Sequence, residues 1–300
     1  MKIVIVGQGA IGLLWYHKLS ENINNSVSLL CSDRIKTAPA HTYFTDVNGQ
    51  INKLSLLLTT DKHLHSAELI LVCVKSYHIK SALLSLIKHL NKCATIIFCH
   101  NGMSDNVAIS SLQQPCYSLL TTHGVKIIKP FQAQHTGLGH NDLGLINGKV
   151  VVERQTHIIN TLTQALPSLL LSQNIKIKQW QKLAINCVIN PLTALNNIDN
   201  GEVLYDEYIS TINKLLKEII LIAGREKVIF DFNELKAQVF NVAKSTAKNC
   251  SSMRSDILQK RRTEIDYING YIVKLANKAH ISVPENEKLW QEIKALECKY

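Results

Sequence analysis

The feature that most constrains the fold is a glycine-rich turn at the start of the chain. A β-branched run, residues 2–6 (KIVIV), leads into the turn, and residues 10–19 after it have a helical composition. The turn has the pattern GxGxxG and consists of Gly7, Gln8, Gly9, Ala10, Ile11 and Gly12. In this pattern the glycines allow a tight turn, a close approach to a pyrophosphate and close helix packing, while the helix N-terminus offers N–H groups. The motif predicts a dinucleotide site; the alternative is a plain glycine turn.

Two later strands add candidate ligands to this site. Residues 68–74 and 94–99 are nearly continuous apolar runs, as in strands buried in a parallel sheet. Lys75 follows the first run and Asn101 follows the second. Because a doubly wound sheet binds ligands at the carboxyl ends of its strands, we expect Lys75 near a cofactor phosphate or ribose and Asn101 near cofactor or substrate. The alternative for Asn101 is to shape the turn at Gly102.

The segment after the second expected strand, residues 26–31, bears on cofactor choice. It reads Ser32-Asp33-Arg34. An acid at this place usually binds the ribose 2′-hydroxyl of NAD, whereas a cation binds the 2′-phosphate of NADP. Asp33 therefore favours NAD, while Ser32 and Arg34 could hold a phosphate or, for Arg34, be a loop cation. The residues alone leave the choice open.

Shorter strands are expected around these elements. Asn48-Gly49, between residues 42–46 and 50–58, is typical of a type I′ hairpin. Residues 77–90 and 153–166 have helical patterns. Between residues 116 and 146, three short strands separated by glycines suggest an antiparallel extension of the sheet; they are residues 118–122, 125–128 and 133–137.

Strand patterning largely ends near residue 172, and amphipathic helical segments take over. These are residues 178–195, 207–224, 232–248, 263–279 and 286–296. The sequence therefore predicts an α/β protein. A doubly wound, Rossmann-like sheet in residues 1–172 would bind the nucleotide, and an all-α domain in residues 173–300 would bind the substrate.

A polar stripe distinguishes the first of these helices. At about 100° per residue, Lys182, Asn186 and Asn190 fall within about a quarter turn of one another. The opposite side is apolar, and Pro191 is expected to kink the helix or end it a turn earlier. One ammonium and two carboxamides suit an oxygen-rich ligand, and an ammonium can donate the proton that a ketone needs when a hydride reduces it. The alternative is the solvated face of an ordinary amphipathic helix.

Two sites near the C-terminus complete the candidates. Thr263 and Asp266 have the spacing of a capping box, which would put Glu264 in the first turn of a helix. Glu264 could pair with Lys182 or a substrate hydroxyl, or be only a helix-start acid. Ser251 and Ser252 stand before a helix, where a hydroxyl caps the helix or binds a ligand.

Composition narrows the functional classes. The formal charge is +10, but the 33 Lys and Arg are dispersed and the longest basic run is residues 260–262, which favours small anionic ligands over nucleic acid. Eight cysteines without a CxxC pair fit a reducing cytoplasm. The twelve histidines lack metal-ligand spacing, so they are expected on the surface or in loops, with no metal. No apolar stretch approaches the roughly 20 residues that span a bilayer, so we expect a chain that is neither secreted nor membrane-spanning.

Several motifs together resemble the ketopantoate reductase family, also called 2-dehydropantoate 2-reductase. They occur in order along nearly the whole chain: GQGAIG, HNGM at 100–103, KLAINCVINPLTA at 182–194, NG at 200–201, SSM at 251–253 and RRTEIDYINGY at 261–271. The resemblance implies NADPH-dependent reduction of 2-dehydropantoate to (R)-pantoate on the route to pantothenate and coenzyme A. It also implies a helical second domain like the C-terminal domain of 6-phosphogluconate dehydrogenase, and a cytoplasmic monomer or homodimer.

The resemblance also assigns roles to residues. Lys182 would be the general acid, and Glu264 would act with it and contact the cofactor. The substrate would be bound by Asn186, Asn190, Asn200 and Ser252. The cofactor would be held by the residues from Gly7 to Gly12, Lys75, Asn101 and the backbone near Val125. Where the family often has an arginine at the end of the second strand, this chain has Ser32, with Arg34 two residues later.

Two other classes of function remain open from the sequence. One is a related NADH- or NADPH-dependent reductase of another branched 2-oxo acid, because pocket shape sets side-chain selectivity. The other is a protein without catalytic activity, either an NADPH-binding sensor or a nucleic-acid binder. A sensor should have lost Lys182 or Glu264, and a nucleic-acid binder should have clustered basic residues; the chain shows neither property.

Overall fold

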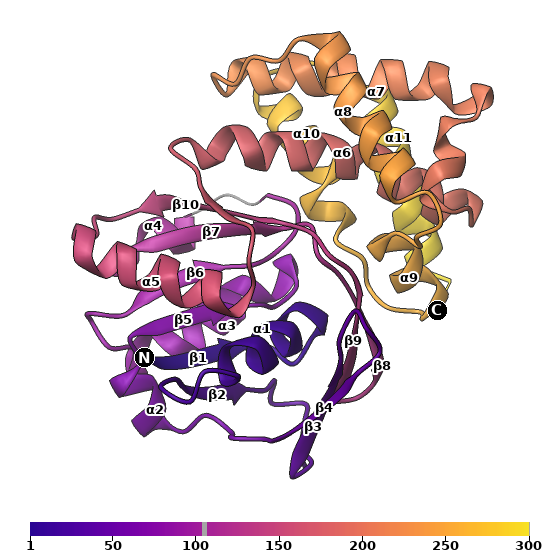
Figure 1. Ribbon diagram of the computed structural model, residues 1–300. Helices are drawn as coiled ribbons and strands as arrows, with labels where there is room; N and C mark the ends of the chain where they lie inside the picture. Colours follow the sequence, from indigo (N-terminus) through magenta and orange to yellow (C-terminus); the bar gives the residue numbers. More distant parts are fainter. Residues whose placement is uncertain (104–106, 300) are drawn as a thin grey trace. The chain divides into compact units, whose positions relative to one another are not determined.

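The computed structural model describes residues 1–103 and 107–299, which form two compact units (Figure 1). The first unit contains Met1–His100 and continues to Ile175. The second unit runs on from Lys176 and also includes residues 101–103. The assignment of nucleotide binding to residues 1–172 and of substrate binding to residues 173–300 stays a prediction.

A seven-stranded sheet, counted over the described residues, forms the centre of the first unit. Its strands lie in the order β11 (Leu169–Leu171), β10 (Asn141–Asn147), β7 (Cys116–Thr121), β6 (Thr95–Phe98), β5 (Leu69–Val72), β1 (Lys2–Val6) and β2 (Ser26–Leu30). Neighbouring strands from β7 to β2 are parallel, whereas β10 runs antiparallel to β7. The predicted doubly wound sheet is therefore confirmed.

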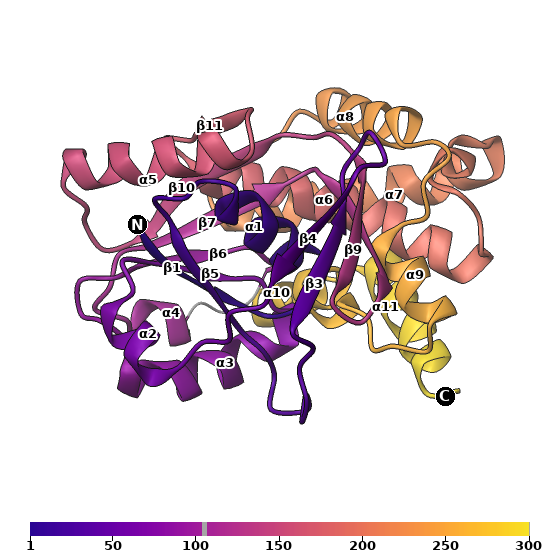
Figure 2. The ribbon, with the colours of Figure 1, turned by 60° about the horizontal axis from the view of Figure 1, so that its bottom comes forward.

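Helices cover both faces of this sheet (Figure 2). Ile3 and Ile5 face a core shared with α1 (Ala10–Ser20) and α5 (Val152–Ala165), whereas Val4 and Val6 face the opposite core. That second core contains residues of α2 (Asp61–Ser66), α3 (Ile79–Leu86) and α4 (Val107–Ser110). Because both faces are buried, the central strands are apolar throughout, which explains their continuous hydrophobic runs.

The strand order reverses at β1, which pairs with β2 on one side and with β5 on the other. Open α/β sheets bind ligands beside the carboxyl ends of the strands at such a reversal. Gly7 directly follows β1, and Lys75 lies three residues after β5. The topology thus brings the glycine turn and Lys75 to the edge where a nucleotide is expected.

A separate four-stranded sheet, again counted over the described residues, corrects one expectation. Its order is β4 (Ile51–Ser55), β3 (His41–Thr45), β9 (Gln132–Gly137) and β8 (Gly124–Lys129). The prediction that residues 125–128 and 133–137 extend the main sheet is wrong; only β10 adds an antiparallel strand there. Phe44 of β3 and Ala133 of β9 are buried in the core that contains α1, so the small sheet packs against this helix.

The β3–β4 hairpin is confirmed, but its predicted turn type is wrong. A type I′ turn needs positive φ at both central residues. Gly49 has φ of +85°, whereas Asn48 does not have a positive φ. Gly49 N–H instead donates to Asp46 O at 3.1 Å, and the Asp46 carboxylate accepts the N–H groups of Asn48 and Gln50. The side chain of Asp46 therefore fixes a three-residue loop that ends in the left-handed glycine.

The single helix expected over residues 77–90 is also divided. The segment begins as a 3-10 turn, η1 (Ser76–His78), in which His78 N–H donates to Lys75 O at 2.8 Å. It continues as α3 and ends as a second 3-10 turn, η2 (Ile87–His89). Because 3-10 turns with hydrogen bonds between residues i and i+3 form at both ends, the α-helical part is only Ile79–Leu86.

The second unit is helical, as predicted. Its elements are α6 (Ile175–Asn196), η3 (Asn200–Leu204), α7 (Asp206–Arg225), α8 (Phe232–Ser245), α9 (Ser252–Leu258), η4 (Ile265–Tyr267), α10 (Asn269–Lys278) and α11 (Pro284–Glu297). One buried apolar cluster joins α6, α7, α8, α10 and α11. Within the described parts of the chain, no helix is both long and apolar enough to cross a membrane.

Candidate active site

The glycine turn of the first unit is shaped by backbone packing. Gly7 has φ of +107°, and a Cβ there would lie 3.0 Å from Cys73 O. A Cβ on Gly12 would lie 1.9 Å from Gly7 O, far inside van der Waals contact. Gly7 therefore requires glycine because of its positive φ and its approach to the backbone after β5. Gly12 requires glycine because the start of α1 folds directly onto the turn.

Gly9 is the N-cap of α1, and the space around it is open. A Cβ on Gly9 would come no closer than 4.0 Å to Cys73 O. Among the described residues, no side chain caps this helix start. The unused N–H groups and the open approach fit a phosphate, because helix N-termini bind anions through such groups.

At the end of β2, Ser32 is paired with the turn. Gln8 Nε2 donates to Ser32 Oγ at 3.2 Å, and Ser32 N–H donates to Gln8 Oε1 at 3.1 Å. Arg34 is exposed, and within residues 1–103 and 107–299 it forms no hydrogen bond or ion pair. The guanidinium is thus available to a ligand, while its predicted contact with a 2′-phosphate stays a prediction.

Lys75 and Val125 lie in different parts of the first unit. Lys75 is half-buried at the start of η1, beyond the carboxyl end of β5. Val125 lies on β8 of the small sheet, where it packs against the core that contains α1. Cofactor binding by the two residues stays a prediction.

Asn101 belongs to the second unit, although it follows β6 of the main sheet. The two residues after it are tied to Tyr267: Met103 N–H donates to Tyr267 O at 2.8 Å, and a Cβ on Gly102 would lie 2.4 Å from the same oxygen. Gly102 has φ of +72°, so only glycine fits this approach. The contact holds Asn101 near the segment that begins at Glu264.

Helix α6 presents the predicted polar stripe. Lys182 and Asn186 are half-buried, and Asn190 is only 6% exposed. On the opposite side Ala184, Cys187, Val188 and Leu192 are buried as expected, whereas Leu195 is partly buried. The expectation that Pro191 ends the helix a turn earlier is wrong, because α6 continues to Asn196.

Asn200 lies in a buried position at the start of η3. Its Nδ2 donates to Thr246 Oγ1 at 3.1 Å, and its backbone N–H donates to Asn249 O at 3.1 Å. Its Oδ1 is buried and has no hydrogen-bond partner among the described residues. A buried carbonyl oxygen without a donor is costly, so this atom is a natural acceptor for a ligand hydroxyl.

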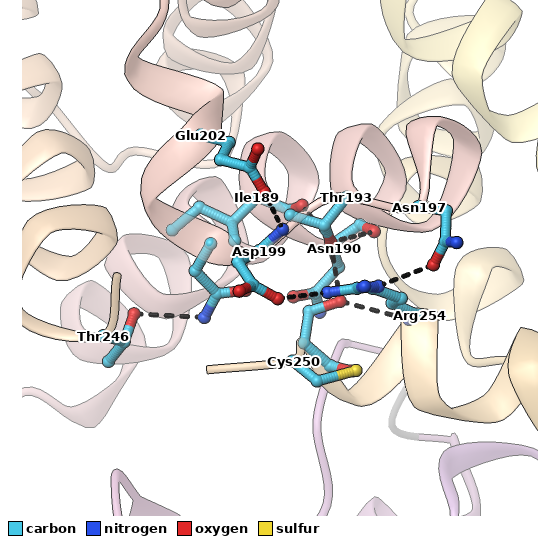
Figure 3. A network of polar contacts seen from close by, with 11 residues as sticks. Ile189, Asn190, Thr193, Asn197, Asp199, Glu202, Thr246, Cys250 and Arg254 are labelled. Carbon is cyan, nitrogen blue, oxygen red and sulfur yellow. Dashed lines mark hydrogen bonds and ion pairs between the residues drawn. The ribbon is translucent and has the colours of Figure 1, made fainter. Parts of the chain in front are cut away.

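A polar network joins the end of α6 to α9 (Figure 3). Arg254 Nε donates to Asn197 Oδ1 at 2.9 Å, and its Nη1 pairs with the Asp199 carboxylate. Asp199 N–H in turn donates to Glu202 Oε2 at 2.7 Å. Arg254 therefore fixes the loop that leads into Asn200.

The two serines before α9 have different positions. Ser251 is buried and caps the helix, since its Oγ accepts the Arg254 N–H at 3.1 Å and lies 2.7 Å from Thr193 Oγ1. Ser252 is exposed at the first helical position. The capping alternative thus applies to Ser251, and substrate binding by Ser252 stays a prediction.

The expected capping box at Thr263 is wrong. The helix begins at Asn269, and Glu264 precedes a short 3-10 turn rather than lying in the first turn of α10. Thr263 N–H donates instead to Glu297 Oε1 at 2.7 Å. Glu264 is 5% exposed, so its carboxylate is a buried group in this segment.

Asp266, the other half of the expected box, is bound elsewhere. Trp290 Nε1 donates to Asp266 Oδ1 at 2.9 Å, and Arg262 Nη2 lies 3.0 Å from Oδ2. Burial by itself would raise the pKa of Asp266, but these bonds and nearby Lys294 lower the pKa below its ordinary value. The Asp266 carboxylate thus binds Trp290 and Lys294 of α11 instead of taking part in a capping box with Thr263.

The expectation of surface or loop histidines is wrong for two of them, His17 on α1 and His135 on β9, which are both buried. His123 is also buried but lies in the loop between β7 and β8, where its Nδ1 lies 3.0 Å from His135 Nε2. Burial is the main cause that lowers the pKa of His17 and of His123 to about 4. In the described part of the chain, no three His, Cys, Asp or Glu side chains are grouped to hold a metal.

Sequence reasoning missed two polar side chains that bind α6 or the loop after it: Arg254, which binds Asn197 and Asp199, and Asn269, whose Nδ2 donates to Cys187 O at 3.0 Å. Arg254 follows the SSM motif directly, and Asn269 lies inside the quoted segment 261–271. Neither position has a spacing signal, because the groups they bind lie on other elements. The only available signal was their place within motifs quoted for other residues.

Comparisons with known proteins cover both units. The family model described as "Ketopantoate reductase PanE/ApbA" matches residues 3–148, and the one described as "Ketopantoate reductase PanE/ApbA C terminal" matches residues 174–297. The chain is 35% identical to the 2-dehydropantoate 2-reductase of Vibrio cholerae over 299 residues, covering 99% of this chain and 98% of that protein. It is 33% identical to the Yersinia pestis enzyme of the same name over 305 residues, covering 100% and 96%.

Solved structures show the same fold. A PanE/ApbA family ketopantoate reductase from Ralstonia eutropha superposes with a TM-score of 0.87 at 23% identity, covering 100% of this chain and 99% of that one. A D-mandelate dehydrogenase, solved with NADH and anilino(oxo)acetate, superposes with a TM-score of 0.89 at 22% identity and the same coverage. The full-length identity above 30% to curated relatives and the two matching family models show that this chain belongs to the ketopantoate reductase family.

Proposed function

We propose that this protein is an NADPH-dependent 2-dehydropantoate 2-reductase that forms (R)-pantoate for pantothenate and coenzyme A synthesis. The observation that supports this most is the stripe on α6, where an ammonium and two carboxamides share one face beside a buried apolar core. Family membership, which extends along both units, indicates 2-dehydropantoate as the substrate, since the curated relatives are named 2-dehydropantoate 2-reductase.

The first unit would hold the cofactor. The open backbone at Gly9 and the N-terminus of α1 would take the pyrophosphate, and Lys75 would add a cation at the same edge of the sheet. Arg34 would bind the 2′-phosphate that distinguishes NADPH from NADH. When bound, the nicotinamide supplies the hydride that reduces the keto carbon.

The second unit would hold the oxo acid and supply the proton. Asn186 and Asn190 would donate hydrogen bonds to the carboxylate, while Asn200 Oδ1 would accept from a hydroxyl of the substrate. Lys182 Nζ would donate a proton to the oxygen as negative charge develops on it. Glu264 would orient Lys182 or the substrate hydroxyl, and Ser252 would add a hydroxyl contact.

A panel of 2-oxo acids tests this proposal. Purified protein is assayed with 2-dehydropantoate, other branched 2-oxo acids and a phenyl-substituted 2-oxo acid, each with NADPH and with NADH. The highest kcat/KM is expected for 2-dehydropantoate with NADPH, because kcat/KM measures discrimination between competing substrates. A higher value for another acid would indicate a reductase of different selectivity. Nucleotide binding without turnover of any acid would indicate a sensor.

A further inference from the structure

Pro191 leaves a gap in the hydrogen bonding of helix α6. Proline has no N–H group, so the carbonyl of Cys187, four residues earlier, loses its helical donor. Both residues are buried, and a buried carbonyl without a donor is strongly disfavoured. The helix nevertheless continues through Pro191 to Asn196. Something outside the helix must therefore compensate.

Asn269 supplies the missing donor. It is the first residue of α10, it is 0% exposed, and its Nδ2 donates to Cys187 O at 3.0 Å. The bond joins residues 82 positions apart in the sequence. A side-chain amide of one helix thus replaces a backbone N–H of another.

A relay of polar groups fixes the orientation of this amide. A carboxylate only accepts hydrogen bonds, so Asn286 turns its Nδ2 toward Glu218 Oε2, at 2.8 Å. Asn286 Oδ1 then accepts from Asn269 Nδ2 at 3.1 Å, which leaves the second hydrogen of that amide for Cys187 O.

Glu218 is itself held in place at the start of α11. Its Oε1 accepts the N–H of Glu285 at 2.9 Å, and its Oε2 accepts the N–H of Asn286 at 3.0 Å. The relay therefore starts from a fixed carboxylate on α7, passes through α11 and α10, and ends at α6.

The end of this relay lies next to the polar stripe. Asn190 directly precedes Pro191 and follows Cys187 by three residues. Helices bend at proline where the flanking carbonyls are free to tilt. We propose that Asn269 is a positioning residue that completes α6 at Pro191 and thereby fixes Asn190 relative to Lys182. For its effect on the oxo acid, this inference rests on the proposed function.

A double-mutant cycle tests the inference. Asn269→Ala removes the donor, and Pro191→Ala restores a backbone N–H to Cys187 O. In the native background, Asn269→Ala is expected to raise the KM for 2-dehydropantoate about tenfold, since small misplacements of binding groups are costly, and to leave the KM for NADPH unchanged. In the Pro191→Ala background, the same change is expected to alter the KM for 2-dehydropantoate by less than about twofold.

A matched control separates positioning from general stability. Ile272 lies on the same helix and is fully buried in the apolar cluster of the second unit, and Ile272→Val removes one methylene group there. It should lower Tm without changing the KM for either substrate. If Asn269→Ala lowers Tm and leaves the KM for 2-dehydropantoate unchanged, or raises that KM equally in both backgrounds, the inference is overturned.

Two further outcomes are distinguishable. If the wild-type protein reduces no oxo acid, the proposed function fails, but Tm still tests the hydrogen bond: Asn269→Ala should lower Tm more with Pro191 present than with Ala at that position. An equal loss of Tm would refute the compensation. If Asn269→Ala does not fold, Asn286→Ala is used instead, because it removes the acceptor that orients the Asn269 amide. Asn286→Ala should then have a larger effect on Tm and on the KM for 2-dehydropantoate with Pro191 present than in the Pro191→Ala background. An equal effect in both backgrounds would overturn the inference.

Discussion

The buried imidazole of His17 is expected to make the first unit less stable in acid. His17 lies on α1, 1% exposed, and its ring stacks on Phe44 with centroids 5.3 Å apart. Nε2 lies 3.4 Å from Thr42 Oγ1, and Nδ1 has no partner among the described residues. Burial first, and the charge of Lys18 second, lower the pKa of His17 from 6.5 to about 4.

The sign of the effect follows from which state binds the proton. Below about pH 6.5 the unfolded chain protonates His17 while the folded unit keeps it neutral, so stability falls with pH until the folded pKa is reached. A gap between 6.5 and about 4 corresponds to about 3 kcal/mol in total. About 2 kcal/mol of that is lost between about pH 7 and about pH 5.

Hydrogen exchange of the α1 amides measures this loss within the first unit alone. Wild-type protein should lose about 2 kcal/mol more opening free energy between those pH values than His17→Leu, which cannot titrate. His157→Leu, at an exposed position on α5, should behave as wild type. Equal pH dependence for wild type and His17→Leu would refute the idea that the fold holds this imidazole neutral.

Three further predictions concern the proposed reaction. Lys182→Met should lower kcat by about 10²-fold or more and leave the nucleotide Kd unchanged, because the proton is needed mainly in the transition state. A near-normal kcat in steady-state assays would show that Lys182 is not the general acid. Gly12→Ala should raise the NADPH Kd about tenfold or more, because the new Cβ would lie 1.9 Å from Gly7 O. The control is Gly137→Ala, whose Cβ would have no atom within 4 Å; this variant should bind NADPH normally in the same titration. Arg34→Ala should reduce the ratio of kcat/KM for NADPH to that for NADH; an unchanged ratio would show that another group reads the 2′-phosphate.

Local patterns predicted the main sheet and the helical second unit because their causes are local. Gly12 is required by its contact with Gly7 O inside a six-residue turn, and Gly7 has a φ of +107°, which favours glycine. The apolar runs of β5 and β6 follow from burial on both faces. Such requirements appear directly in the order of residue types.

The small sheet could not be predicted because its central pairing is non-local. Strand β3 pairs with β9, and the register joins Phe44 to Ala133, residues far apart in the sequence. Either strand alone shows the alternation of a half-buried strand, which does not identify its neighbour.

The errors in the second unit have the same cause. At Thr263 the sequence has a local capping pattern, but the Thr263 N–H binds Glu297 instead. At Pro191 the sequence has a local helix-ending signal, but Asn269 donates to the carbonyl of Cys187 that proline leaves without a donor. Both partners come from other helices. The polar stripe on α6 was predictable from periodicity, but the groups that hold it in place were not.

Pantoate formation by the purified protein tests the central claim most directly. Protein is mixed with NADPH and 2-dehydropantoate, and nucleotide oxidation and product are measured together. The account predicts one (R)-pantoate for each NADPH oxidised, with this conversion lost in Lys182→Met. NADPH oxidation without pantoate, or no oxidation with either nucleotide, would contradict it.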